Sequence, residues 1–155
     1  MPSNQTNTEI LKNATFLRRV CALVYDSFVV FSFLILITGL ALAINQGHSL
    51  LPHRELFLAY LFIGTGLFIG WFWQKAGQTL GMLAWRIKLV NEDFSPVTWR
   101  TAIKRYLIGT LCLALGGIGL IWCLFDKEKR ALQDKFTKTR VVHLTQKVEK
   151  RKKSK

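Results

Sequence analysis

Residues 16–44 read FLRRVCALVYDSFVVFSFLILITGLALAI, and this stretch decides the fold. No Lys, Arg, Asp or Glu occurs in the 27 residues from Ser27 to His53. The same holds for the 19 residues from Leu56 to Gln74 and the 20 residues from Tyr106 to Phe125. A helix needs about 20 apolar residues to cross the hydrocarbon core of a bilayer. The sequence therefore predicts an integral membrane protein of the all-α class.

The composition agrees with this prediction once charge and hydrophobicity are assigned to different stretches. The 155 residues include 22 Lys and Arg against nine Asp and Glu, a net charge of +13, while half of the residues are hydrophobic. A soluble domain with this charge would also be polar throughout. Separate apolar and basic stretches exclude both a water-soluble core and a disordered basic protein as the simplest interpretation.

The expected architecture has two transmembrane helices, a third apolar segment that is re-entrant or spanning, and a cytoplasmic amphipathic segment between the second and the third. The first apolar run, Val20 to Ile44, is about twice as long as the core of a signal peptide, so a retained helix is preferred to a cleaved one. The expected parts are a polar arm (1–15), a membrane domain (16–142) with apolar segments at about 20–44, 56–73 and 106–125, and a basic tail (143–155).

Lys and Arg mark the cytoplasmic side of a membrane protein. There are three before the first apolar window, one (Arg54) in the first loop, six from Gln74 to Arg105 and twelve after Phe125. The first three counts predict a cytoplasmic N-terminus and two crossings. A third crossing would place the most basic segment outside, unless residues 106–125 form a re-entrant hairpin broken at Gly116-Gly117-Ile118-Gly119. We favour the cytoplasmic C-terminus, and a plain third crossing is the alternative.

Asp26 is the most informative single residue, because a carboxylate inside an apolar helix is costly. It stands seven positions after Arg19, which places both side chains on one face of a helix. Arg105, at the start of the third apolar segment, is the other candidate partner. Asp26 is thus either a carboxylate that handles a proton or cation, or one half of a buried ion pair that holds helices together.

Two glycine pairs indicate close packing. Gly66 and Gly70 lie in the second apolar helix and predict a packing face, whereas residues 77–81 (GQTLG) predict a turn followed by the start of a helix. Leu83 to Val90 is expected to be an interfacial helix or a strand. A β-branched run follows later, from Thr139 to Val142.

No pattern in the sequence points to an enzyme, a cofactor or a metal site. Cys21, Cys112 and Cys123 have no ligand spacing, and the three histidines are scattered. The tail from Lys147 to Lys155 has six basic residues and no aromatic ones. We expect it to attract anionic lipid, or to be solvated, and expect no nucleic-acid partner.

Several spaced residues resemble the RDD family of bacterial membrane proteins, which is named for one arginine and two aspartates. The similarity runs in order along most of the chain. It is carried by Phe16-x-x-Arg19-x-x-Ala22-x-x-x-Asp26, Gly77-Gln78-Thr79-Leu80-Gly81, Arg86-x-x-x-Val90, Pro96, Arg105, and Leu132-Gln133-Asp134-Lys135-x-Thr137-x-Thr139-x-Val141-Val142.

By position, the resemblance implies that the arginine is Arg19 and the first aspartate Asp26. The second aspartate is Asp134, with Asp126 as the alternative. The sequence departs from the family pattern at Met82, where a basic residue is common, and at Gln133, where His is common. Gln133 removes a titratable neighbour of Asp134.

The resemblance implies a multi-pass protein of the bacterial plasma (inner) membrane. For this family, transport of unknown ligands and cation/proton exchange have been suggested. Our first hypothesis is transport of an ion or small solute by a homo-oligomer, with Arg19, Asp26, Asp134 and Arg105 as its functional charges. The alternative is a non-catalytic scaffold or assembly factor that binds another membrane protein. Both place the chain in the lipid bilayer.

Overall fold

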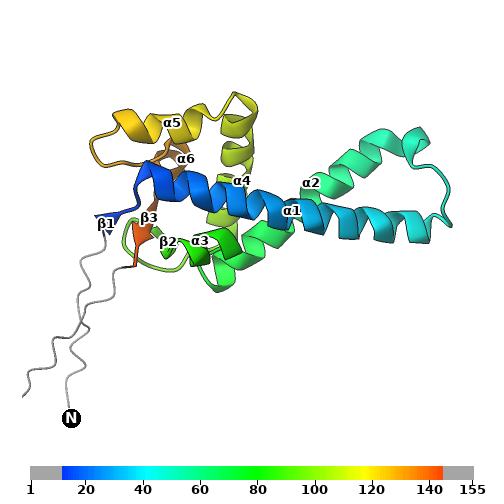
Figure 1. Ribbon diagram of the computed structural model, residues 1–155, viewed down its shortest axis with the longest axis horizontal. Helices are drawn as coiled ribbons and strands as arrows, with labels where there is room; N and C mark the ends of the chain where they lie inside the picture. The colour runs from blue at the N-terminus through cyan, green and yellow to red at the C-terminus, as the bar shows by residue number, and fades with distance from the viewer. Residues whose placement is uncertain (1–11, 145–155) are drawn as a thin grey trace, which may run out of the picture.

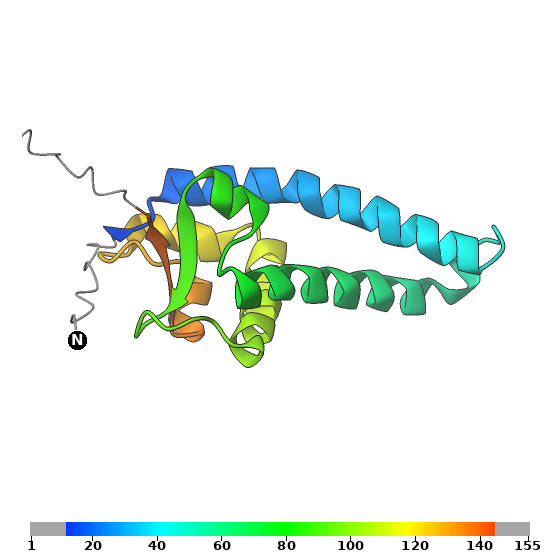
Figure 2. The same cartoon turned by 90° about the horizontal axis from the view of Figure 1, so that it is seen from below.

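The computed structural model describes residues 12–144. Most of the expected polar arm and the basic tail from Lys147 to Lys155 lie outside the described residues. Two antiparallel helices form a long hairpin, and the remaining elements form a compact cap at one end of it (Figures 1 and 2).

The hairpin consists of α1 (Phe16–Ile44), the short 3-10 helix η1 (Leu51–His53) and α2 (Arg54–Lys75). The connection begins at Asn45 and continues through Gln46 and Gly47, whose positive φ angles of 53° and 80° turn the chain. Phe33 and Phe68 stack between the helices with ring centroids 4.2 Å apart.

Two helical segments are long and apolar enough to cross a membrane, Phe16–Ile44 and Arg54–Ala84. In their most apolar windows only 6% and 11% of the residues are buried within the protein. Apolar side chains that cover the hairpin without being buried are typical of helices that face lipid or other membrane helices. The expectation of a helical membrane protein is therefore confirmed.

The cap adds a small sheet that the expectation of an all-α fold did not include. Its strands are β1 (Lys12–Asn13), β2 (Ile87–Asn91) and β3 (Thr139–His143), antiparallel in the order β1-β3-β2. Ile87 pairs with His143 and Asn91 with Thr139. The strand alternative for the segment after Leu83 is thus the one observed, and the β-branched run after Lys138 forms the central strand.

Four short or medium helices complete the cap. Ile87, Leu89, Val97, Ala102 and Val141 form its apolar core together with Ala14, Ala22 and Met82. The helices are α3 (Leu80–Ala84), α4 (Trp99–Ala114), α5 (Ile118–Phe125) and α6 (Leu132–Phe136).

The third apolar segment is a bent pair of helices. Helices α4 and α5 together are long and apolar enough for a membrane segment, but they meet at an angle of 91°, as in a broken span or a re-entrant segment. Gly116 and Gly117 form the corner, both with φ of 79°, which glycine adopts without steric cost. Gly119 then lets α5 approach Cys112 and Gln133, because a Cβ there would lie 2.6 Å from atoms of both.

The packing face predicted at Gly66 and Gly70 is present, and aromatic rings occupy it. A Cβ at Gly66 would lie 2.8 Å from the ring of Tyr106, and one at Gly70 would lie 3.0 Å from the ring of Trp99. The Tyr106 hydroxyl also donates to the carbonyl of Phe62 at 3.0 Å. These contacts seat α4 against α2.

Candidate functional site

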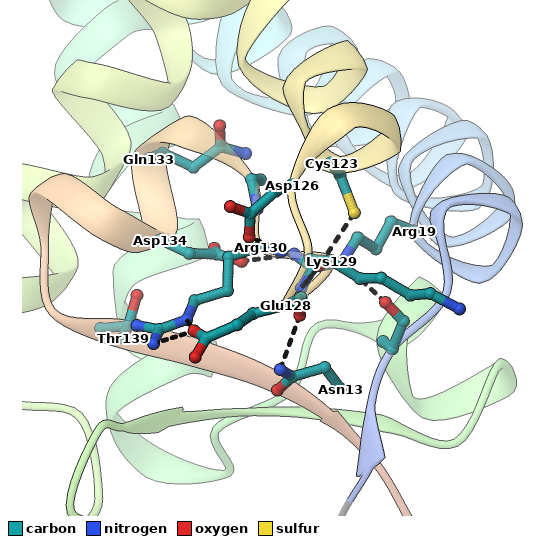
Figure 3. Close-up of polar contacts among 12 residues, drawn as sticks. Asn13, Arg19, Cys123, Asp126, Glu128, Lys129, Arg130, Gln133, Asp134 and Thr139 are labelled. Carbon is teal, nitrogen blue, oxygen red and sulfur yellow. Dashed lines mark hydrogen bonds and ion pairs between the residues drawn. The ribbon is translucent and has the colours of Figure 1, made fainter.

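The candidate site is a charged cluster in the cap, and Asp134 is its centre. Asp134 lies in α6 and is fully buried. Its Oδ2 lies 2.6 Å from Nη1 of Arg19, and its Oδ1 lies 2.6 Å from Nη2 of Arg105. Figure 3 shows Arg19 of α1 reaching toward Asp134 beneath the loop that carries Lys129 and Arg130. One carboxylate thus joins α1, α4 and α6.

Further donors of the two arginines also bind groups inside the protein. Arg19 donates from Nε to the carbonyl of Ala14 at 3.2 Å and from Nη2 to the carbonyl of Lys129 at 3.3 Å. Arg105 donates from Nη1 to the Thr139 hydroxyl at 2.6 Å. Its guanidinium also lies 5.5 Å from the centre of the Trp73 ring. The planar guanidinium forks suit such multiple contacts, which an ammonium could not reproduce.

The charges of the cluster hold Asp134 ionised. Burial by itself raises the pKa of Asp134, but the neighbouring charges and hydrogen bonds of Arg105 and Arg19 outweigh it and keep that pKa below its ordinary value. The backbone N–H of Ala131 adds a hydrogen bond to Oδ2 at 3.2 Å. An ionised carboxylate between two cations is a strong cross-link when it is intact, and removal of one partner leaves buried charge uncompensated.

Asp26 is not part of this cluster. Its Oδ2 accepts a short hydrogen bond from the Thr79 hydroxyl, and its Oδ1 accepts one from the N–H of Gly81 at 2.8 Å. The expected pairing of Asp26 with Arg19 or Arg105 is therefore wrong. Both arginines are drawn into the cap by Asp134, a residue more than a hundred positions from Arg19 in the sequence.

The turn predicted at residues 77–81 is what brings α3 to Asp26. Gly77 has a φ of 67°, and Thr79 caps α3 by accepting a hydrogen bond from the N–H of Met82. A Cβ at Gly81 would lie 2.2 Å from the carbonyl oxygen of Ala22. Only glycine therefore allows α3 to pack this closely on α1.

The position of Asp26 along α1 lowers the cost of its charge. Helix α1 has 29 residues and is about 43 Å long, which exceeds the roughly 30 Å of a hydrocarbon core. Eighteen residues, or about 27 Å, separate Asp26 from the end of α1 at Ile44. Its partners Thr79 and Gly81 follow the end of α2 at Lys75. Asp26 thus lies near the level at which the hairpin enters the cap.

Asp126, the alternative for the second aspartate, has a different environment. Its Oδ1 lies 2.6 Å from Nζ of Lys135, and its Oδ2 accepts from the N–H of Arg130 at 2.9 Å. These hydrogen bonds lower the pKa of Asp126 at the surface of the cap. It contacts neither of the buried arginines, so the geometry favours Asp134.

The two departures from the family pattern fall in packed positions. Met82 is buried in the core of the cap beside Ala22. Gln133 packs against Gly119, and its Oε1 is buried without a hydrogen-bond partner among the described residues. A hydrogen-bond donor brought close to Gln133 would therefore find this buried oxygen available as an acceptor.

Sequence reasoning missed Thr139, Trp73 and Thr79 as members of the two polar contacts. Thr139 lies in the β-branched run of β3, where a strand was expected but no role for its hydroxyl. Trp73 lies near the end of α2, where no contact was expected, and its ring contacts Arg105. Thr79 carried a usable signal, since threonine before a short apolar run is typical of a helix N-cap.

Within residues 12–144, no group of three or more His, Cys, Asp or Glu side chains could hold a metal ion. All three cysteines are free thiols. The candidate site consists of ion pairs and hydrogen bonds between groups of the protein itself. These contacts can fix α1, α4 and α6 relative to one another.

Comparison with protein families matches residues 13–138 to the RDD family. Comparisons with curated proteins and with solved structures gave no significant match. The matched range contains Arg19, Asp26, Asp134 and Arg105, and it covers most of the chain. The protein is a membrane protein with apolar helices, and it belongs to the RDD family.

Proposed function

We propose that this protein is a non-catalytic assembly module of the bacterial inner membrane. In this proposal the hairpin crosses the membrane twice and binds a membrane protein, either a second copy or a different partner. The cap, which includes the amphipathic segment between the second and third apolar segments, lies in the cytoplasm with the N-terminus.

The observation that carries the proposal is the closure of the charged cluster. The carboxylate of Asp134 contacts both buried arginines, and further donors of these arginines bind Ala14, Lys129 and Thr139. A transport site needs charged groups that can exchange one partner for another. The cluster instead supports a rigid cap, and a rigid cap would hold the two helices in a fixed orientation for a partner.

The surface of the hairpin supports the same proposal. Large apolar side chains remain exposed along both helices, including Leu36 of α1 at 68% and Ile63 of α2 at 59%. Such positions meet either lipid tails or the helices of another protein. A photo-crosslinking amino acid at Leu36 or Ile63, in native membranes, should give a protein adduct of one defined mass. Lipid adducts alone at both sites would contradict the proposal.

Cation/proton exchange is the second candidate, and the environment of Asp26 favours it. Among the described residues, no cation forms an ion pair with this carboxylate, which contacts only a hydroxyl and a backbone N–H. A carboxylate in an apolar helix without a cationic partner is the kind of group that a proton or a metal cation uses in a transporter.

Flux in proteoliposomes separates the two candidates. The exchanger predicts cation-driven proton movement that Asp26→Asn abolishes while the level of folded protein stays normal. The assembly module predicts no flux in either protein, with defined adducts from both hairpin sites. Asp126→Asn serves as the matched control, because it removes a carboxylate that lies in the cap, away from the hairpin.

A further inference from the structure

Helix α4 contains the first half of the third apolar segment, and its orientation relative to the hairpin points to a contact with the membrane surface. It lies across the hairpin, transverse to α1 and α2 in both views, at the end where the cap begins (Figures 1 and 2). Helix α5 then turns by 91° and runs back beside the amino-terminal half of α1 (Figures 1 and 2). If α1 and α2 define the direction across the bilayer, α4 lies along the plane of the membrane.

The two faces of α4 have different surroundings. Arg105 and Cys112 are buried, and Arg105 reaches Thr139 of the sheet and Asp134 of α6. That face therefore points into the cap. On another face Ile103, Leu107 and Leu111 are 50%, 49% and 62% exposed. With a spacing of four residues, these three side chains form a single stripe, turned away from the cap.

The charges beside the stripe are all basic. Arg100 and Lys104 are exposed on α4, and the helix contains no acidic residue. An apolar stripe flanked by basic side chains is the pattern of a helix that lies in the membrane interface, with the stripe among the acyl chains and the cations at the phosphates. Long basic side chains can reach the headgroups from such a position.

The level of α4 along the hairpin agrees with this arrangement. Trp99 packs on Gly70 and Tyr106 packs on Gly66, so α4 joins α2 within the last ten residues before Lys75. This part of α2 approaches the boundary where Asp26 meets Thr79 and Gly81. The contacts at Gly66 and Gly70 therefore place α4 in the half of the hairpin that is nearest the cap.

We propose that α4 is an in-plane helix that binds the surface of the inner leaflet, with Ile103, Leu107 and Leu111 inserted and Arg100 and Lys104 on anionic headgroups. In this arrangement the chain crosses the bilayer twice, and its twelve basic residues after Phe125 stay on the same side as the N-terminus. The proposal concerns the lipid contact of one helix and holds for either candidate function.

The test measures membrane depth at two sites of the full chain in bilayer nanodiscs. A nitroxide is attached to Leu107→Cys or to Leu36→Cys after replacement of the three native cysteines by alanine. We expect a shallow position for the label at 107 and a deep one for the label at 36, which lies eight residues from the end of α1. Equal depths at the two sites would overturn the proposal.

A second measurement leaves the native cysteines in place. Leu107→Lys should be inserted and folded at near wild-type yield, because a lysine at the interface extends to the headgroups, whereas Leu36→Lys should reduce the yield several-fold. A comparable loss of yield for both variants would overturn the in-plane position of α4. A reporter fused after Lys155 that is found on the side of the membrane opposite to the cytoplasm would overturn it as well.

The headgroup contact is tested by comparing nanodiscs of phosphatidylglycerol with nanodiscs of phosphatidylcholine. The unfolding temperature of the wild type should be higher in phosphatidylglycerol, and the double variant Arg100→Gln/Lys104→Gln should reduce this difference. The control pair Lys127→Gln/Lys138→Gln removes the same charge from the exposed surface of the cap. An equal reduction in both pairs would show that only net charge matters and would refute the site.

Discussion

The carboxylate of Asp134 lies 2.6 Å from the guanidinium of Arg19, although 115 positions separate the two residues in the chain. This contact joins distant parts of the chain, because Arg19 lies in the first turn of the first membrane helix and Asp134 lies in the last helix of the cap. Arg105 binds the other carboxylate oxygen of Asp134. Three of the charges that the family resemblance singled out thus form one structural unit, while Asp26 forms another contact with α3.

Asp134→Asn should destabilise the protein strongly. The variant leaves two buried arginines without a carboxylate, and removal of one partner from a buried pair costs about 3–5 kcal/mol. Thermal unfolding in detergent, followed by the loss of the monodisperse peak in size-exclusion chromatography, measures the effect. Asp126→Asn is the control. It breaks an ion pair with the half-exposed Lys135 but leaves both buried arginines paired, so it should lower the unfolding temperature much less than Asp134→Asn does.

Arg105→Lys should also be destabilising although it preserves the charge. Lysine cannot contact Asp134 and Thr139 with a planar fork, and it loses part of the contact with the Trp73 ring. We expect a cost of about 2 kcal/mol, the typical value for a lost hydrogen bond to a charged group. Arg100→Lys, on the exposed face of the same helix, should unfold within a degree or two of the wild type.

Acidification should weaken the cluster. Burial raises the pKa of Asp134, but Arg105 and Arg19 more than offset this and lower it in the folded state. A lowered folded pKa means that the stabilisation is complete above the unfolded value of about 3.9 and is lost as the pH falls through the folded pKa. The difference in unfolding temperature between wild type and Asp134→Asn should be constant from pH 7 to 5 and should shrink below about pH 4. A difference that grows on acidification would contradict the assignment.

Gly81→Ala should separate α3 from α1. The added Cβ would lie 2.2 Å from the Ala22 carbonyl oxygen and 2.9 Å from the Asp26 carboxylate, so the backbone must move. We expect a cost of about 2 kcal/mol or more, within the range reported for overpacked sites. Gly109→Ala is the matched control, since nothing lies within 4 Å of its new Cβ, and it should be neutral or stabilising by up to about 1 kcal/mol.

The hairpin could be predicted from the sequence because its evidence is local. The apolar segments expected at about 20–44 and 56–73 match α1 and α2 to within four residues, since membrane spans are specified by composition over one stretch of chain. The turn at Gly77 and the start of α3 were likewise predicted from a five-residue pattern. Strand β3 followed from its β-branched residues.

The pairing of charges could not be predicted in the same way. From the sequence, Arg19 and Asp26 appear as natural partners because they share one helix face. The competing carboxylate of Asp134 lies 115 positions from Arg19 and reaches it through the tertiary packing of the cap, in which α6 contacts α4, α5 and β3. Likewise, the right-angled corner at Gly116 and Gly117 depends on the packing of α5 against α1 and α6. Glycines permit a corner, but distant contacts decide its angle.

The contact between Arg19 and Asp134 has a consequence for biosynthesis. Arg19 enters the membrane boundary early, at the start of the first helix to be made, while its carboxylate is synthesised 115 residues later. During that interval the guanidinium has no counter-charge from the cap, and the central strand that positions α6 against it does not yet exist. A nascent or truncated chain would therefore expose a cationic helix start and an unfinished sheet. Helix α6, which follows the other helices of the cap in the chain, thus supplies the carboxylate that pairs with the start of α1.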